Sequence, residues 1–416
     1  MRTIWLARLA FKNLSRYKKR SIITMSAITF GLGLFILVDS ILEAADEESM
    51  RNLRRYETAD GALAPSGFTD EREDPSLKNS FRYKSLMEEL QGIGIETAPR
   101  VAFQADLVFF KHPFPEDGSI PVLLNALDPL QDKGVFRLDE TVFEGRWLEQ
   151  GQDGIVLGRY LAEDMGAVIG APMIALTQTR DGYHQVIELE VVGILDCPNP
   201  QVNRLGAYIT LETADTYLEL HDSVTALHAR FPSQFTRMNP TDQLNTIAAG
   251  RSLKWFGWEE LAPDYVAVIQ AERTSSGTIV FLILIIASVG ISNTMLMAIL
   301  ERRRETGIMR AMGLSDWQLR RLFLWEALGL GVFGSSLGLV FGAIINIPLV
   351  KYGLNYSRIM RESSFGYRVS GVFYGTWHPS GFVLAFLLGT GISLLVAAIS
   401  LRRLLRLDIV TALRID

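Results

Sequence analysis

The feature that most constrains this 416-residue chain is a set of four long apolar runs that almost no charged residue interrupts. They occupy residues 22–42, 278–300, 322–350 and 381–401. At about 1.5 Å of rise per helical residue, each run can cross a hydrocarbon layer roughly 30 Å thick. Buried helices of a large soluble core are the alternative, but such helices rarely extend for about 20 residues with so small a polar face. We therefore predict an α-helical membrane protein with four transmembrane helices.

Basic residues beside the apolar runs predict their orientation. Seven lysines and arginines precede the first run, no acidic residue occurs before Asp39, and further arginines cluster in residues 302–321 and 402–414. Loops rich in Lys and Arg stay in the cytoplasm, so we expect both termini there, as an even number of spans requires. Residues 46–275 carry 37 Asp and Glu against 20 Lys and Arg, a balance that a translocated domain tolerates.

The runs divide the chain into predicted segments. Residues 1–21 form a cytoplasmic amphipathic helix with a basic stripe at Arg8, Lys12 and Arg16, although a plain basic flank would carry the same charge. The first run could also be read as a cleaved signal peptide, with residues 42–45 as a weak cleavage site. The predicted plan is a first span at 22–42, an extracytoplasmic domain at 46–275, a second span at 278–300, a cytoplasmic elbow at 301–321, a third span at 322–350, a short outer loop at 351–380, a fourth span at 381–401 and a cytoplasmic tail at 402–416.

The segment between the first two spans predicts a mixed α and β domain. Short runs of β-branched and aromatic residues, broken by Gly, Pro, Asn and Asp, predict strands at 101–110, 120–126, 154–158, 186–195 and 207–211. Residues 159–165 predict a helix that stops at Gly166. Residues 60–80 are rich in Gly, Pro, Asp and Glu and predict a loop. The single cysteine, Cys197, excludes an internal disulfide.

The connection after the second span predicts a tight turn. A helical run reaches Met312, Gly313 follows it, and Ser315 with Gln318 has the spacing of a capping box. One helix should therefore end and another begin within three residues.

One face of the helix before this turn is apolar. Glu305, Ile308, Met309 and Met312 follow at i, i+3, i+4 and i+7. Such a stripe outside the membrane, bordered by arginines, suits a groove on a soluble partner. A membrane helix that extends into the interface would show the same pattern.

Residues 293–313, NTMLMAILERRRETGIMRAMG, resemble the hallmark of the FtsX, MacB and Lol class of ABC permeases, roughly N-x-M-x-x-x-V-x-E-R-x-R-E-I-G-x-x-R-A-x-G. The similarity continues through Glu326, the glycine-rich third run and the tail at 406–414, where Ile409 and Thr411 replace the usual proline and glutamate. Residues 146–148, 154–170 and 191–195 are similar to the outer domain of this class. The resemblance implies an α+β domain of the MacB-type periplasmic core class, and a permease that works as a pair with an identical or related subunit. It also implies a coupling helix at Glu305, Ile308, Met309, Met312 and Gly313 that docks into an ATPase, and a location in the inner membrane of a bacterium.

The chain lacks a nucleotide-binding motif of its own. It contains no G-x-x-x-x-G-K-[ST] and no Gly-Lys dipeptide. We therefore expect a non-catalytic subunit without a cofactor, with ATP and Mg on a cytoplasmic ABC ATPase dimer of separate chains. The five histidines show no metal-ligand spacing, and nothing points to nucleic acid. Asp39, close to the end of the first span, could mark a substrate path or simply reach water.

Three glycines in the third run predict helix packing. Gly334, Gly338 and Gly342 stand four apart, so a neighbouring helix can approach their backbone closely. Residues 334–338 also match the G-x-S-x-G pattern of hydrolases, but that pattern requires a turn between a strand and a helix, not a membrane span.

The resemblance implies a mechanical function, in which the closing ATPase moves the elbow and the helices carry the motion to the outer domain. Lipoprotein release from the inner membrane fits the Lol-like size, the four-span layout and the missing ATPase. A MacB-like efflux permease, an FtsX-like mechanotransmitter and a non-transporting receptor or scaffold remain alternatives. Membrane lipid, a lipoprotein cargo and an outer acceptor are the further partners expected. Acyl chains would need an apolar place between the outer ends of the first and second spans of paired subunits, for which the candidates are Phe35, Val38, Ile41, Ile279 and Phe281.

Overall fold

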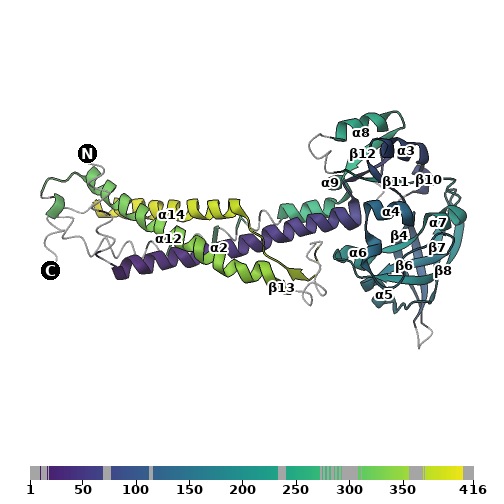
Figure 1. The fold of residues 1–416 in the computed structure, drawn as a ribbon, viewed down its shortest axis with the longest axis horizontal. Coiled ribbons are helices and arrows are strands. Elements are labelled where there is room, and N and C mark those ends of the chain that lie inside the picture. The colour runs from purple at the N-terminus through teal and green to yellow at the C-terminus, as the bar shows by residue number, and fades with distance from the viewer. Residues whose placement is uncertain are drawn as a thin grey trace. The chain divides into compact units, whose positions relative to one another are not determined.

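The structure, a computed structural model, describes most of the chain (Figure 1). The described ranges are 18–68, 76–111, 116–232, 240–271, 312–355 and 371–405, together with positions 10, 16, 274, 277–278, 281–282, 285, 288–289, 292, 308–310 and 369. The chain divides into two compact units. The helical unit comprises residues 1–45, 270–356 and 372–416, and the α+β unit comprises residues 46–269 and 357–371.

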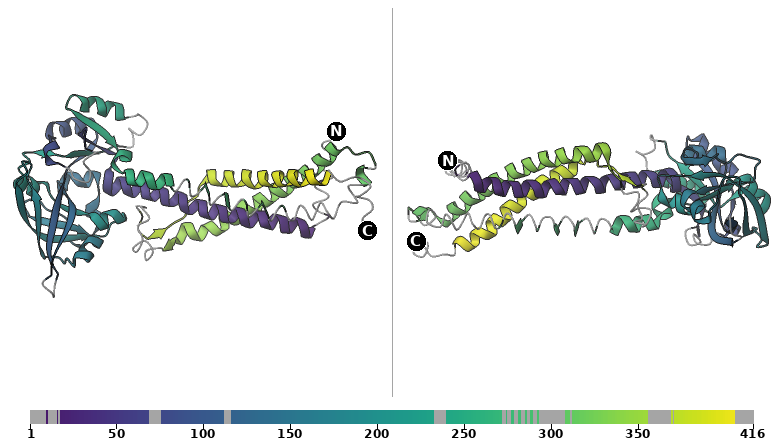
Figure 2. Two further views of the ribbon diagram at one scale, coloured as in Figure 1. Left: turned by 180° about the vertical axis from the view of Figure 1, so that it is seen from behind. Right: turned by 90° about the horizontal axis from the view of Figure 1, so that it is seen from below.

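In the described part of the helical unit, the long helices are α2 (Lys18–Leu53), α12 (Asp316–Tyr352) and α14 (Pro379–Leu405) (Figures 1 and 2). Within the described residues, these three helices are long and apolar enough to cross a membrane. The predicted span at 278–300 lies mostly outside the described residues, so the count of four spans stays a prediction. The short strands β13 (Leu354–Asn355) and β14 (Val372–Phe373) pair between α12 and α14.

The helices pack through a shared apolar core. Ile28, Leu32, Phe35 and Ile36 of α2 lie at 5% exposure or less, in one cluster with residues of the other two helices. Those residues are Ala327 and Leu330 of α12 and Ala385, Val396 and Ala397 of α14.

Six strands of the α+β unit close into a ring. β3 (Glu96–Lys111) pairs with β4 (Glu116–Leu127), and the ring continues through β9 (Ala207–Thr210), β6 (Gly154–Gly158), β8 (His184–Leu195) and β7 (Pro172–Gln178) back to β3. β4 with β9 and β6 with β8 are parallel pairs, and the other four pairs are antiparallel. β5 (Val142–Gly145) adds to β8 outside the ring. Alternate side chains of these strands point inward and form the largest core, as strand geometry requires.

The first half of β3 belongs to a second, antiparallel part of the sheet. Residues 96–100 pair with β11 (Ala226–Arg230), which pairs with β1 (Gly61–Pro65) and then β12 (Leu253–Gly257). A further pair joins β2 (Phe81–Arg82) to β10 (Ser223–Val224). Helices of the unit include α3 (Lys84–Gly92), α4 (Pro129–Val135), α5 (Arg159–Met165), α6 (Pro200–Leu205), α7 (Leu211–Leu218), α8 (Pro240–Ala249) and α9 (Trp258–Leu261). Single turns are the π-helical η1 (Arg54–Thr58) and the 3-10 helices η2 (Leu77–Asn79) and η3 (Leu138–Thr141).

The strands predicted at 101–110, 120–126, 154–158, 186–195 and 207–211 are confirmed, with changes of a few residues at their ends. Helix α5 ends as predicted, because Gly166 adopts a left-handed conformation with φ of 65°. The loop predicted at 60–80 is wrong for its first residues, since 61–65 form the buried strand β1. This strand has the sequence GALAP and lacks β-branched and aromatic residues, so its position between β11 and β12 decides its conformation.

Candidate functional site

The predicted turn at Gly313 is present in the structure. Gly313 has φ of 90°, its amide donates to Arg310 O (3.0 Å), and the Leu314 amide donates to Met309 O (3.1 Å). This pair of bonds is the Schellman ending of a helix, in which glycine avoids the strain of positive φ. The Ser315–Gln318 capping box then starts α12, with both of its reciprocal hydrogen bonds formed. The turn is therefore fixed by local sequence on both sides.

The residues of the predicted coupling face do not all point to the surface. Ile308 and Met312 are 45% and 69% exposed. Met309 instead packs against Ala10 and Leu322 of the same unit. Glu305 lies outside the described residues. The exposed part of this face is thus Ile308 and Met312, and Met309 anchors the turn.

Trp317, in the first turn of α12, extends the exposed surface beyond Gly313. Its side chain is 54% exposed, and the Arg321 guanidinium lies 3.2 Å from the centre of its ring. Arg310 bonds Asp316 across the turn at 3.0 Å. Sequence reasoning missed Trp317, although its i, i+4 spacing from Arg321 was a usable signal.

The three glycines of the third run face α2. A β-carbon on Gly334 would lie 3.1 Å from Ile28, one on Gly338 would lie 3.0 Å from Leu32, and one on Gly342 would lie 2.6 Å from Ile36. Thr29 Oγ1 donates to Gly334 O at 3.3 Å along the same line. We call this contact the glycine seam. It brings the α12 backbone directly against α2 side chains, an arrangement typical of helices packed in membranes.

The residues predicted to receive acyl chains lie in different surroundings. Phe35 is 2% exposed within the core of the helical unit, whereas Val38 and Ile41 are half-buried. Phe281 is 61% exposed, and Ile279 lies outside the described residues. Of this set, Val38, Ile41 and Phe281 present accessible apolar surface.

Asp39 does not stand alone at the end of the apolar run. Its Oδ2 lies 2.9 Å from Nδ1 of His378, which precedes α14. The two residues are 339 positions apart, and the sequence offered no signal that pairs them.

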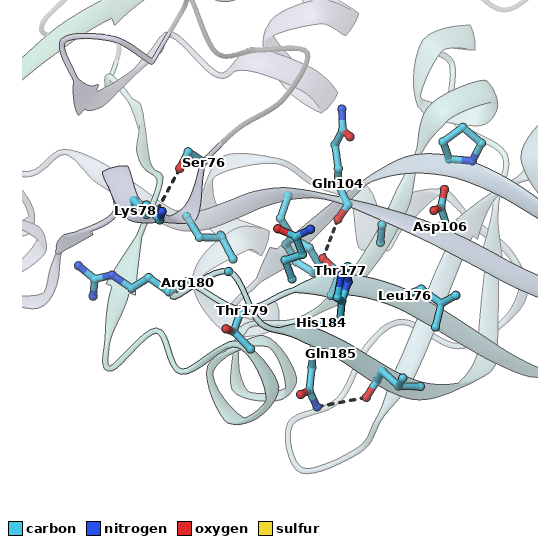
Figure 3. A pocket seen from close by; sticks show the side chains of 17 residues that line it. Ser76, Lys78, Gln104, Asp106, Leu176, Thr177, Thr179, Arg180, His184 and Gln185 are labelled. Carbon is cyan, nitrogen blue, oxygen red and sulfur yellow. Dashed lines mark hydrogen bonds between the residues drawn. The ribbon is translucent and has the colours of Figure 1, made fainter.

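The α+β unit contains a groove of about 780 Å³ (Figure 3). It lies beside residues 101–105 of β3. The pairing of β3 with β11 ends at Arg100, and its pairing with β7 begins at Asp106, so this stretch pairs with neither strand. Two threonines bond the β3 backbone in this gap: Thr225 Oγ1 accepts from Ala102 N (3.0 Å), and Thr177 Oγ1 donates to Gln104 O (2.7 Å).

Polar and apolar groups both line the groove. Lys78 and Arg180 lie toward one end in Figure 3, and Asp106 and Leu176 toward the other. Sequence reasoning missed this site, because the groove arises from how β3 divides its pairing between two strands.

Two buried titratable groups of the α+β unit, Cys197 and Asp132, have pKa values that burial raises. Burial raises the pKa of the Cys197 thiol to about 12, which makes the thiolate scarce at neutral pH. Burial also raises the pKa of Asp132, although the neighbouring Arg100 opposes the rise. In the part of the chain that the structure describes, no three His, Cys, Asp or Glu side chains gather as a metal site requires.

Two family models match the chain. The MacB-like periplasmic core domain matches residues 21–249, more than half of the chain, and the FtsX-like permease C-terminal domain matches residues 277–409.

Similar proteins carry related descriptions. The lipoprotein-releasing system transmembrane protein LolC of Neisseria meningitidis serogroup B is 25% identical over 346 residues, covering 79% of each chain. LolE of Haemophilus influenzae is 24% identical over 239 residues, covering 56% of this chain and 57% of that protein. The ABC transporter permease YtrF of Bacillus subtilis is 40% identical over 72 residues, covering 17% of this chain and 14% of that protein.

Among solved structures, the periplasmic region of MacB from Actinobacillus actinomycetemcomitans is similar at 13% identity. It covers 52% of this chain and 97% of that chain, with a TM-score of 0.35.

Proposed function

The chain belongs to the FtsX, MacB and Lol class of ABC transporter permeases, and we propose that it releases lipoproteins from the inner membrane, driven by a separate ATPase. The observation that carries this proposal is the LolC similarity, which covers 79% of both chains. This share is larger than either structural unit, so the similarity draws on both. In this proposal four helices span the membrane, both termini lie in the cytoplasm, and the α+β unit lies outside.

Removing an acylated protein from a bilayer requires energy input. Each buried CH₂ of an acyl chain contributes about 0.8 kcal/mol, so an anchor with several chains leaves spontaneously only at a very low rate. The chain carries no P-loop, and ATP and Mg are proposed to act on a cytoplasmic ABC ATPase dimer. The work must then pass from that dimer through the permease, which is the non-catalytic subunit.

Exposed side chains at the turn suit the docking of the ATPase. Ile308, Met312 and Trp317 supply apolar area outside the membrane run, and Arg321 stacks on the tryptophan. Desolvated aromatic and aliphatic anchors typically dominate the affinity of such interfaces. In the proposed mechanism the closing ATPase displaces this turn, and α12 moves with it because the capping box joins them rigidly.

The glycine seam is the proposed route from α12 to α2. The side chains of Ile28, Leu32 and Ile36 pack directly against the α12 backbone. Because such a contact leaves little free space, a shift of α12 should displace these three residues. The α2 helix continues to Leu53, and the chain enters the α+β unit at Asp46. A second permease subunit, identical or related, would complete the apolar place to which the candidates Phe35, Val38, Ile41, Ile279 and Phe281 are proposed to contribute.

Photo-crosslinking tests the lipoprotein assignment. A photoreactive residue at Val38 or Ile279 should capture acylated lipoproteins in membranes and lose them when ATP is supplied. The matched control is the same residue at Val340, which is 58% exposed on α12. A lipoprotein variant that lacks its acylated cysteine should not be captured.

Two other outcomes would redirect the proposal. Capture of phospholipid alone, with lipoprotein sorting unchanged after depletion of the protein, would exclude lipoprotein release and leave the permease class standing. Loss of drug resistance or of cell-wall hydrolase activity in the depleted cells would favour the MacB-like or FtsX-like alternative.

A further inference from the structure

A group of polar residues fastens three helices of the helical unit at one place. Ser40 Oγ of α2 donates to Thr376 O (2.8 Å) and accepts from Thr376 N (2.9 Å). Asn346 Nδ2 of α12 donates to the same Thr376 oxygen (3.1 Å). Ser40 is 2% exposed and Asn346 is fully buried. We call Asp39, Ser40, Asn346, Thr376 and His378 the junction.

The junction has a charged half beside this neutral one. Asp39 Oδ2 lies 2.9 Å from His378 Nδ1, and both side chains are about one quarter exposed. His378 Nε2 contacts the Ser380 hydroxyl and lies 3.9 Å from Glu43 Oε1. Apart from the local contact of His378 with Ser380, each of these interactions joins α2 or α12 to the segment that leads into α14.

Two glycines allow the elements to meet this closely. A β-carbon on Gly375 would lie 2.7 Å from Ser40 Oγ, and one on Gly381 would lie 1.9 Å from Asp39 Oδ2. The Asp39 carboxylate thus lies against the first turn of α14, where the helix dipole favours negative charge. A side chain at either glycine would separate the helices, so the backbone is shaped to bring these groups together.

Local folding of the helices does not require such a junction. Asp39 and Ser40 lie in the interior of α2, where their own helix needs no cap, and their partners are more than 300 positions away. Helices in lipid gain little from apolar contact with one another, so polar contacts and close packing decide their relative positions.

We propose that the junction is a positioning device, which holds the interior of α2 to the end of α12 and the start of α14, so that a displacement of α12 at the Gly313 turn is transmitted to α2. The glycine seam aligns α2 with α12 over residues 28–36 of α2, and the junction prevents the two helices from sliding past each other just beyond it. The transmission part of this proposal rests on the proposed function, whereas the fastening part does not.

The test breaks the charged half and then rebuilds it. The breaking variants are Asp39→Ala and His378→Ala, and the rebuilt variant exchanges the pair as Asp39→His with His378→Asp. Glu43→Ala is the matched control, since it removes a carboxylate one helical turn away whose distance to His378 is too long for a hydrogen bond.

Fastening is measured without any cargo. Spin labels at Leu42 and Trp377, on a background with Cys197→Ala, report the distance between α2 and the segment before α14 in the full chain. Both breaking variants should broaden the distance distribution, their combination should broaden it no further than either alone, and the exchanged pair should narrow it again. A distribution as narrow as that of the parent in both breaking variants would overturn the proposal.

Transmission is measured as lipoprotein released per ATP hydrolysed by the complex with its ATPase. Both breaking variants should lower this ratio roughly fivefold, a modest effect for a lost hydrogen bond to a charged group, while ATP hydrolysis itself persists. The exchanged pair should recover part of the ratio, which a merely destabilised protein would not do. An unchanged ratio in a variant with a broadened distribution would overturn the proposal. If the proposed function is wrong, the parent protein itself will release no lipoprotein. The distance measurement would then still show whether the junction holds the helices together.

Discussion

The α+β unit buries an ion pair in its interior, whereas the helical unit brings two helices together at glycines. In the α+β unit, Arg100 forms two hydrogen bonds to Asp132, at 2.8 and 3.0 Å, and its guanidinium lies 3.4 Å from the centre of the Phe136 ring. Both charged side chains are at most 7% exposed. In the helical unit, the close contacts of α12 with α2 are made at glycines.

The difference follows from the solvent around each unit. Folding in water is driven by the burial of apolar surface. This gain can offset the desolvation cost of a buried ion pair as long as both partners are present. Between helices in lipid that driving force is absent, and stability comes from close packing at small residues. The same kind of change, a lost charge or an added methyl group, should therefore affect the two units differently.

The largest expected effect is the loss of one partner of the buried ion pair. Arg100→Met leaves Asp132 without its partner and should destabilise the α+β unit by about 3–5 kcal/mol. The double variant Arg100→Met with Asp132→Leu should recover most of this loss. Hydrogen exchange of the strand amides in urea measures the change separately for each unit. The matched control is Arg251→Met, which removes the exposed pair with Glu89 and should cost at most about 1 kcal/mol.

The effect of Arg100→Met should depend on pH in a defined direction. Burial raises the pKa of Asp132 and Arg100 opposes that rise, so removing Arg100 should raise this pKa further. A carboxyl whose pKa is higher in the folded state keeps its full stability below the unfolded pKa, about 4, and loses it as pH rises through the folded pKa. The variant should thus lie closest to the parent in acid and fall behind it toward neutral pH. Equal loss across this range would show that Asp132 stays charged.

An added side chain in the glycine seam should have a smaller but clear effect. Gly338→Leu places a β-carbon 3.0 Å from Leu32, and this carbon cannot rotate away because it is fixed by the backbone. Overpacking of this kind costs about 1–3 kcal/mol. Gly391→Leu on α14 is the control, since its β-carbon would meet no atom within 4 Å. Controlled unfolding in mixed micelles, followed by helix content, compares the two. Equal stability of both variants would mean that the seam does not hold α2 against α12.

Local sequence predicted the features that depend on neighbours in the chain. The apolar runs marked α2, α12 and α14, the Ser315–Gln318 spacing marked the start of α12, and Gly166 marked the end of α5. Each of these follows from a few adjacent residues, because caps and hydrophobic length act over one or several turns.

Features that depend on distant partners could not be predicted in this way. The alternation of β7 shows which side chains are buried, but it does not say that β7 closes a ring between β3 and β8. Met309 was placed on a docking face, yet it packs against Ala10, about 300 residues away in the chain. The Asp39–His378 pair has the same origin, since neither residue carries a local signal for the other.

The smallest effect on stability is expected at the turn before α12, where exposed apolar side chains contribute little to either unit. Ile308→Asp with Met312→Asp should change the stability of the helical unit by no more than about 0.5 kcal/mol, because both side chains are largely exposed. The same double variant should lose the copurifying ATPase, since two carboxylates in a desolvated contact cost several kcal/mol. Met309→Asp is the contrasting variant, and it should destabilise the helical unit because Met309 packs inward against Ala10 and Leu322. Ile308→Val with Met312→Leu keeps the apolar surface and should retain the ATPase. Copurification and ATP turnover of the four proteins, compared with their thermal unfolding, separate docking from folding. If the double Asp variant retained a normally active ATPase, the docking surface would have to lie elsewhere on the chain.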